Sequence, residues 1–181
     1  ERNEWFSDLW TGITGQHQQL TGSEDRERSA AYPITIPYRL ICMYSVYGDT
    51  VFDPFWGTGT TTLAAMAAGR NSVGKELDSG FEAAFADRVD DVPTVTDRIV
   101  ADRLGSHETF VDERRAAGTD FEYEADNYGF PVMTKQERPI QLVTISDIER
   151  TAAGYAVTHE PVDTGWRNDL ETGSDHGSDP N

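Results

Sequence analysis

The eleven residues Val51–Thr61, with the sequence VFDPFWGTGTT, constrain the fold of this chain more than any other stretch. The apolar residues that precede Asp53 predict a buried strand that ends in an acid. Gly57 and Gly59 allow the backbone to take positive φ and let a ligand approach closely. The threonine pair that follows falls where the N-terminus of a helix presents unsatisfied N–H groups to an anion. The stretch therefore predicts a strand, a ligand-binding turn and a helix in succession.

A second acid follows at the end of the next predicted strand. The alanine-rich helix TTLAAMAAGR ends at Gly69, a natural C-terminal cap, and the short strand NSVGKELD then brings Glu76. An acid at the end of the second strand of such a unit is placed to hold the two hydroxyls of a ribose. The two strands and their helix therefore predict a βαβ unit that binds a nucleoside.

Three ligands compete for such a unit: a dinucleotide, a nucleoside triphosphate and S-adenosylmethionine. A dinucleotide fingerprint requires a third glycine, and a triphosphate loop requires a lysine before its serine or threonine. Neither is present. The acid-proline-phenylalanine strand end followed by GTGTT instead resembles the cofactor loop of the DNA amino methyltransferases, which modify exocyclic nitrogens of adenine or cytosine.

The resemblance extends upstream of the loop. The stretch AAYPITIPYRLICMYSVYGDT is similar to that family's lead-in, in which a short helix precedes a glycine-aspartate turn before the cofactor strand. Further upstream, DLWTGITGQHQ resembles the family's linker between the catalytic loop and this lead-in. The ordered match runs from about Trp10 to Asp78. This order of elements favours DNA over RNA or protein as the substrate.

The resemblance implies an α/β fold: a Rossmann-like, mostly parallel sheet with flanking helices that binds S-adenosylmethionine and acts on double-stranded DNA. It also implies the roles of eight residues: Asp53 and Phe55 at the methionine end, Gly57, Gly59, Thr60 and Thr61 as close backbone and helix start, Glu76 on the ribose, and Tyr32 on the cofactor's other side. Lys75 departs from the family, which carries an apolar or aromatic residue there. Its ammonium either pairs with Glu76 or points to solvent, and we expect the second.

The catalytic loop of the family is absent from the sequence. That loop has Asp, Asn or Ser, then two prolines and an aromatic; it accepts hydrogen bonds from the target amine and stacks on the flipped base. No two prolines are consecutive anywhere in the chain. We therefore expect no catalytic residue here, and expect the loop before Glu1 or on another polypeptide. The chain would then be the cofactor-binding and C-terminal part of a longer or split methyltransferase.

Cysteine and histidine usage exclude two other chemistries. Methylation at cytosine C5 needs a cysteine nucleophile, but the single cysteine, Cys42, lies in the apolar stretch RLICMYS, where a buried structural thiol is expected. A lone cysteine forms no internal disulfide, which fits a reducing cytoplasm. The four histidines, His17, His107, His159 and His176, have no metal-ligand spacing, so no metal site is predicted.

The formal net charge of −17, from 32 acids and 15 basic residues, is unusual for a protein that binds DNA. Lysine and arginine normally replace condensed counterions, and an acidic surface is repelled. Either the DNA contacts are confined to a local basic strip, or the cytoplasm is rich in salt, where screening is strong and acids keep the protein hydrated. The presence of only two lysines, Lys75 and Lys135, favours the second explanation. No secretory signal or membrane helix is predicted, and we expect a cytoplasmic protein.

The composition divides the chain into four parts. Residues 1–31 form a polar linker, 32–117 the cofactor-binding core, 118–162 a small β extension, and 163–181 an acidic disordered tail. The core closes with a helix around FEAAFADRV and a helical stretch from Pro93 to Ala117 interrupted at Gly105. Aromatic and β-branched residues in the extension predict a small antiparallel meander. Side chains on or near its loops either contact DNA or cap a sheet edge: Tyr128, Phe130, Lys135, Arg138 and Arg150.

Two rival functions remain open from the sequence. The chain could be a non-catalytic, cofactor-binding subunit of a split enzyme, or a methyltransferase that acts on RNA or protein, because the cofactor loop does not contact the substrate. The sequence does not indicate the target base, the recognition sequence, or whether methylation serves restriction or regulation.

Overall fold

The computed structural model describes residues 2–11, 13 and 32–163. They form two compact units, with the long helix α6 (Val92–Ala116) running from one into the other. The first unit contains the described residues up to Asp102 together with Val143–Glu160, and the second contains Arg103–Leu142. The predicted boundaries at residues 31, 117 and 162 stay predictions. The structure groups residues 143–160 with the first unit rather than with the β extension.

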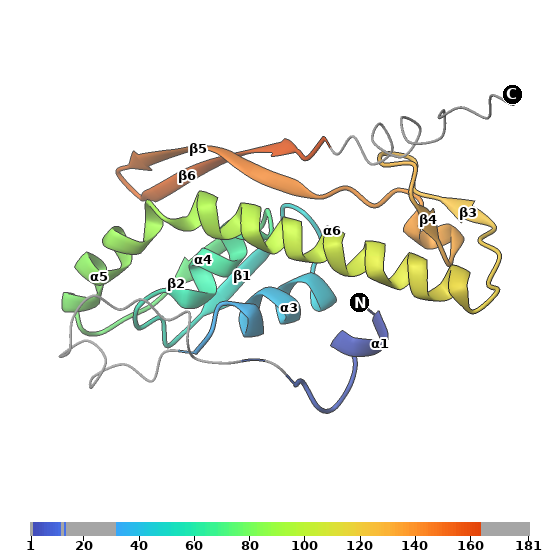
Figure 1. Cartoon of the computed structure of the whole chain (residues 1–181). Helices are drawn as coiled ribbons and strands as arrows, with labels where there is room; N and C mark the ends of the chain where they lie inside the picture. Colours follow the sequence, from blue (N-terminus) through green and yellow to red (C-terminus); the bar gives the residue numbers. More distant parts are fainter. Residues whose placement is uncertain (1, 12, 14–31, 164–181) are drawn as a thin grey trace, which may run out of the picture. The chain divides into compact units, whose positions relative to one another are not determined.

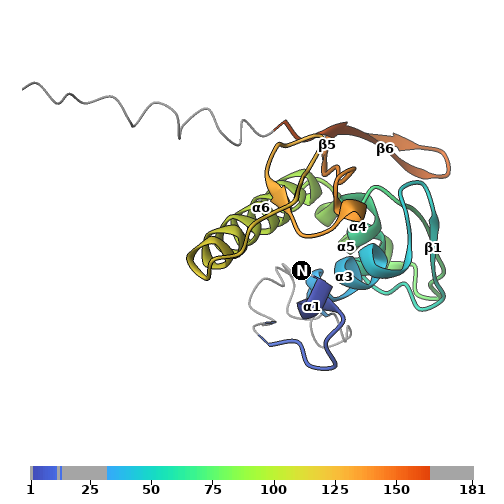
Figure 2. The same cartoon turned by 90° about the vertical axis from the view of Figure 1, so that its right-hand side faces the viewer.

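The centre of the first unit is the predicted βαβ motif. Strands β1 (Thr50–Asp53) and β2 (Asn71–Gly74) pair in parallel, so that Asp53 lies opposite Gly74 at their carboxyl ends. Helix α4 (Thr60–Ala67) connects them and packs on both strands (Figures 1 and 2). Alanine favours the helical conformation, and its small side chain allows close packing. Every residue of α4 from Leu63 onward is buried. The chain therefore folds locally as the motif predicts.

Two core clusters hold helices against α4. Helix α3 (Thr35–Tyr44) contributes Tyr38 and Ile41 to the first cluster, on one side of the α4 alanines. Cys42, predicted to be buried, is only partly buried against that cluster. Helix α5 (Gly80–Val89) places Phe85 and Val89 in the second cluster, with Leu63 of α4. The helix predicted around FEAAFADRV is thus confirmed.

A hairpin formed by β5 (Val143–Thr151) and β6 (Gly154–Pro161) covers the second cluster. Tyr155 meets Phe85 edge to face, with ring centroids 5.7 Å apart. The ring nitrogen Nε2 of His159 donates to the backbone oxygen of Met66 at 2.7 Å. Residues roughly a hundred positions downstream of the glycine loop therefore support the helices behind it.

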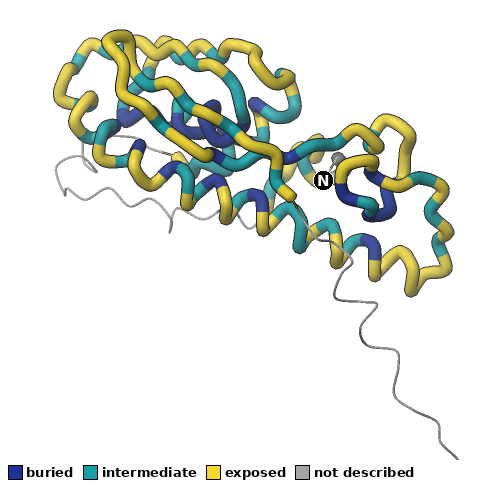
Figure 3. Tube along the Cα trace, turned by 90° about the horizontal axis from the view of Figure 1, so that it is seen from above, coloured by how far each residue is buried: buried dark blue, intermediate teal, exposed yellow. Residues whose placement is uncertain are grey.

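Helix α6 is continuous through Gly105, so the predicted interruption at this glycine is wrong. A Cβ at Gly105 would have no atom within 4 Å, so this position lies in open space. The helix is held instead by buried positions that recur along it, seen as dark blue in Figure 3: Val92, Thr96, Val100 and Val111. Tertiary packing outweighs the roughly 1 kcal/mol cost of one glycine in a helix interior.

The second unit contains a small strand pair and a 3₁₀ turn. Strand β3 (Tyr123–Glu124) pairs antiparallel with β4 (Pro131–Val132), and η2 (Lys135–Glu137) follows. Tyr128 and Phe130, expected either to contact DNA or to cap a sheet edge, are buried and stacked with centroids 5.2 Å apart. The Leu142 N–H donates to the Tyr128 hydroxyl at 2.7 Å. Both rings are therefore core residues of this unit.

The α/β fold class is confirmed, with two corrections. The C-terminal β structure is not one meander but two separate pairs, β3–β4 and β5–β6. Strand β1 was predicted to be buried, yet Phe52 is 62% exposed and its partner in β2, Val73, is 54% exposed. The predicted linker lies mostly outside the described residues, and the predicted acidic tail lies almost wholly outside them.

Candidate cofactor site

The carboxyl ends of β1 and β2 are joined by backbone hydrogen bonds that continue past the strands. The N–H of Lys75 donates to the Asp53 carbonyl at 2.9 Å, and the N–H of Trp56 donates to the Lys75 carbonyl at 3.1 Å. The Asp53 side chain turns the chain sharply, because its Oδ1 accepts the Phe55 N–H at 3.0 Å. Phe55 is left 88% exposed beside the strand ends. These hydrogen bonds bring Asp53, at the end of β1, close to the segment that leads from β2 to Glu76.

Glu76 connects the second strand to the glycine loop. Its Oε2 accepts the Gly57 N–H at 2.8 Å, and its Oε1 accepts the N–H groups of Leu77 at 2.8 Å and Asp78 at 3.0 Å. These hydrogen bonds, that from Asp78 foremost, lower the pKa of Glu76 below its ordinary value. The carboxylate is therefore ionised at neutral pH. It remains an acceptor with lone-pair capacity beyond these three bonds.

The conformation of Gly59 depends on the absence of a side chain. This residue caps α4 with φ of 73°, in the left-handed region that favours glycine. A Cβ here would lie 2.2 Å from Cδ2 of Phe85 and 3.0 Å from Cζ2 of Trp56. The two rings pack with centroids 4.6 Å apart, directly against the loop. Gly59 is thus required by both its backbone angle and its neighbours.

The threonines at the start of α4 are each hydrogen-bonded to a different element. Thr61 shares a hydrogen bond of 2.6 Å with the hydroxyl of Tyr32, from the lead-in. Thr62 accepts the indole N–H of Trp56 at 2.8 Å and lies 2.8 Å from the Ser72 hydroxyl on β2. The lead-in, the loop and strand β2 are therefore tied to the first turn of α4.

The structure brings the eight predicted residues to one end of the βαβ unit, through the contacts just described. Two further residues lie at the same place and were not predicted. Leu77 is 94% exposed next to Glu76, and the Arg88 guanidinium donates to the loop from α5. Exposure of an apolar residue is not visible in a sequence, but the position of Leu77 directly after Glu76, the predicted ribose acid, was a usable signal. Lys75 is exposed, and among the described residues it forms no ion pair with Glu76, as expected.

Neither metal ligation nor membrane spanning is indicated. Among the described residues, no three His, Cys, Asp or Glu side chains gather as metal ligands would. None of the described helices combines the length and the apolar character that crossing a bilayer requires.

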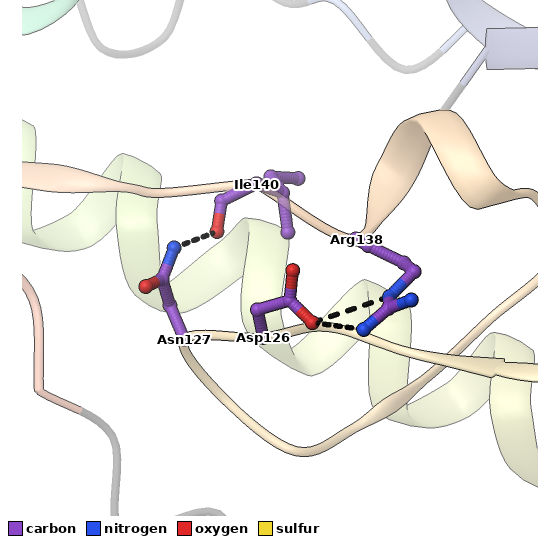
Figure 4. Close-up of polar contacts among 4 residues, drawn as sticks. All are labelled: Asp126, Asn127, Arg138 and Ile140. Atoms are coloured by element: carbon purple, nitrogen blue, oxygen red, sulfur yellow. Dashed lines mark hydrogen bonds and ion pairs between the residues drawn. The ribbon is translucent and has the colours of Figure 1, made fainter.

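The basic residues expected near the C-terminal strands are exposed and partly neutralised. Arg138 forms an ion pair of 2.7 Å with Asp126, while the neighbouring Asn127 donates to the Ile140 carbonyl (Figure 4). In the first unit, Arg150 lies 3.7 Å from Glu82. Acids thus accompany these arginines at short range, and a basic strip for DNA is not evident from them.

Comparison with known proteins shows which proteins this chain resembles. The model of a family described as DNA methylase, of N6 and N4 type, matches residues 1–87. The chain is 46% identical over 142 residues to the type II methyltransferase M.MthZI of Methanothermobacter thermautotrophicus, which covers 78% of the chain. It is 45% identical over 89 residues, 49% of the chain, to M.MjaI of Methanocaldococcus jannaschii. Residues 1–87 therefore match the DNA methylase family. The resemblance drawn from the cofactor loop and its lead-in is thereby confirmed.

The chain spans only part of the DNA methylases that it matches: 39% of the length of M.MthZI and 28% of M.MjaI. Among solved structures it is similar to a protein of Thermus thermophilus, described as a DNA modification methylase, in complex with S-adenosyl-L-methionine. That similarity has 31% sequence identity and a TM-score of 0.38, and covers 48% of this chain and 30% of the other.

Proposed function

We propose that this chain binds S-adenosylmethionine as the cofactor-binding part of a DNA amino methyltransferase. The observation that carries the proposal is the junction of Glu76 with the glycine loop, where the Glu76 carboxylate lies 2.8 Å from the Gly57 nitrogen. An ionised carboxylate at the end of the second strand suits the two hydroxyls of a ribose. The family match supports the same cofactor class.

The residues around this junction fit the cofactor. Glu76 would hold the ribose, the N-terminus of α4 from Thr60 would face the carboxylate end, and exposed Phe55 and Leu77 offer apolar surface. Asp53 would lie at the methionine end, and Tyr32, held by Thr61, would close the opposite side. When bound, the group supplies a methyl on a sulfonium. The contribution of this chain is to hold that donor in line with an acceptor amine, since such transfer depends chiefly on alignment.

The acceptor amine requires residues that this chain does not contain. No Asp, Asn or Ser followed by two prolines and an aromatic occurs in the sequence. We propose that this loop comes from a separate segment, which binds double-stranded DNA together with this chain. Parallel sheets are normally covered on both faces, and the exposed pair Phe52 and Val73 on β1 and β2 suits such a segment. The methylated atom would be cytosine N4 or adenine N6.

Calorimetric titration with S-adenosylmethionine tests the cofactor site. The wild-type chain is expected to bind, and Glu76→Ala to weaken binding about ten- to a hundredfold, because a hydrogen bond to a charged group is lost. Glu82→Ala, at an exposed acid on α5, serves as the matched control and should bind as the wild type does. Unchanged affinity in Glu76→Ala would place the ribose elsewhere.

Transfer of labelled methyl groups to DNA tests the division of labour. The chain alone is expected to transfer none, and addition of a polypeptide that carries the proline-proline-aromatic loop should restore transfer. Nucleoside analysis should then find N4-methylcytosine or N6-methyladenine and no C5-methylcytosine. Robust transfer by the chain alone would contradict this division.

We also propose that the acidic surface is an adaptation to high salt. With 32 acids against 15 basic residues, self-repulsion should destabilise the compact state at low ionic strength. Added salt shortens this repulsion to the scale of neighbouring side chains. The melting temperature should therefore rise between about 0.1 and 2 M salt. A constant melting temperature would contradict the adaptation and leave the cofactor proposal untouched.

A further inference from the structure

Arg88 holds the glycine loop from the side of α5. Its Nη1 donates to the Thr58 carbonyl at 2.8 Å, to the Thr58 hydroxyl at 3.0 Å and to the Thr60 hydroxyl at 3.1 Å. Thr58 and Thr60 are 2% and 4% exposed, so these contacts are shielded from water. Phe85, one turn earlier on the same helix, packs where a Cβ of Gly59 would lie. Helix α5 thus supports three consecutive loop residues.

The charge of Arg88 has no acidic partner in the described part of the chain. Partial burial lowers its pKa, but an arginine starts so high that it stays protonated at neutral pH. A shielded charge is normally paired, because removing it from water is costly. Here its hydrogen-bond partners are a carbonyl and two hydroxyls, all neutral. This unpaired positive charge lies beside the loop that is proposed to bind a ligand. A negatively charged group on that ligand would compensate it.

Apart from Lys75, whose side chain is exposed, the other charged groups at this loop are acids. Asp53 lies at the start of the turn and Glu76 accepts the Gly57 N–H. A carboxylate on a ligand would be repelled by both. Arg88 would attract such a carboxylate. The N-terminus of α4, whose partial positive charge lies beside Thr60, would attract it as well. Because arginine only donates, the Thr58 and Thr60 hydroxyls that accept from it have their own hydrogens free to point elsewhere.

We propose that Arg88 is a positioning residue which fixes the Thr58–Thr60 backbone and gives the loop its preference for a ligand that bears a carboxylate. These two roles depend on different properties of the arginine side chain. The hydrogen bonds to Thr58 and Thr60 set the shape of the loop, and the positive charge sets the preference. This inference rests on the proposed binding of S-adenosylmethionine, whose amino-acid end carries the carboxylate.

The test compares two ligands that differ in that group alone: S-adenosylmethionine and its decarboxylated form. In the wild type the carboxylate-bearing ligand should bind more tightly. In Arg88→Met its affinity should fall roughly tenfold, while that of the decarboxylated ligand changes less than about threefold, because only the first interacts with the lost charge. Arg88→Lys keeps the charge without the planar fork, and should keep the preference. Arg150→Met, an exposed arginine in the same unit that does not contact the loop, should behave as the wild type.

Hydrogen exchange of the ligand-free protein tests the loop role. The amides of residues 57–62 should exchange faster in Arg88→Met and in Arg88→Lys than in the wild type. In Arg150→Met their exchange rates should equal those of the wild type. Equal loss of affinity for both ligands in Arg88→Met would mean a purely structural role and overturn the preference, as would no loss for either. If Arg88→Met does not fold, loss of the preference in Arg88→Lys overturns the proposal. Failure of the wild type to bind either ligand would instead refute the proposed function.

Discussion

The glycine loop, Trp56–Thr62, and the open face of strands β1 and β2 differ in how many contacts with other elements hold their residues. From Trp56 to Thr62, each residue is held by a hydrogen bond or by ring packing from another element. On the open face, Phe52 and Val73 lie side by side in register, and both are more than half exposed. The described residues therefore hold the loop in shape, but they do not cover this face of the two strands. A loop can be fully supported within a segment whose strands are not.

The largest effect should come from adding a methyl group to the loop. Gly59→Ala places a Cβ 2.2 Å from a Phe85 carbon at φ of 73°. Backbone strain and overpacking together should lower the free energy of unfolding by roughly 2 to 5 kcal/mol. Chemical denaturation would measure this. Gly57→Ala is the matched control: its φ is 52°, but its nearest neighbour lies at 3.9 Å, so only the strain of about 1 to 2 kcal/mol is expected. Equal losses would show that the loop is not tightly packed.

A somewhat smaller effect is expected on the open face, and only when the complementary segment is present. Phe52→Ala should change the stability of this chain alone by less than about 0.5 kcal/mol, because its side chain is already exposed. Association with a polypeptide that carries the catalytic loop should weaken by about 2 kcal/mol, the gain from burying such a side chain. Titration of the two polypeptides would measure this. Val46→Ala, at another exposed apolar residue, should not alter association.

The bond between Glu76 and the loop should respond to acid. The folded pKa of Glu76 is lowered from 4.5, so its contribution to stability is fully present above about pH 4.5 and is lost as pH falls through the lowered value. Below pH 4.5 the wild type should therefore lose stability more steeply than Glu76→Gln, which has no proton to bind. Thermal melting of both proteins between pH 3 and 6 would measure the difference. Parallel curves would show that the carboxylate does not hold the loop.

The smallest effect is expected at the exposed ion pair of the second unit. Arg138 and Asp126 are about half exposed, so their pair should contribute less than about 1 kcal/mol. A double-mutant cycle with Arg138→Ala and Asp126→Ala would measure the coupling, which added salt should reduce further. A coupling of several kcal/mol would show that this surface, like the glycine loop, is built from interdependent contacts.

The sequence was sufficient for the parts of the fold that depend on neighbours in the chain. The motif from Val51 to Glu76 determined the strand, turn, helix and second strand, because glycine, threonine and alanine have strong local preferences. The helix around FEAAFADRV followed from its periodicity. Local rules failed at Gly105, where packing along α6 carried the helix through.

What the sequence did not show depends on contacts between distant residues. The support of Phe85 by Tyr155 joins positions seventy residues apart, and no local pattern encodes it. The contacts of Arg88 have the same origin, because it lies 28 positions from Thr60. The exposure of Phe52 was missed for another reason. An apolar strand predicts burial, but the group that covers it need not lie in the same segment.

Trp56 links two glycines that are fifteen positions apart. Its Cδ1 lies 2.0 Å from where a Cβ on Gly74 would stand, and its Cζ2 lies 3.0 Å from where one on Gly59 would stand. During divergence, a change at Gly74 therefore requires a change at Trp56. A relative that carries a small side chain in place of Trp56 has room for alanine in place of Gly74. At Gly59 the φ of 73° and Phe85 still demand glycine, so one of these glycines is free to vary with the tryptophan and the other is not.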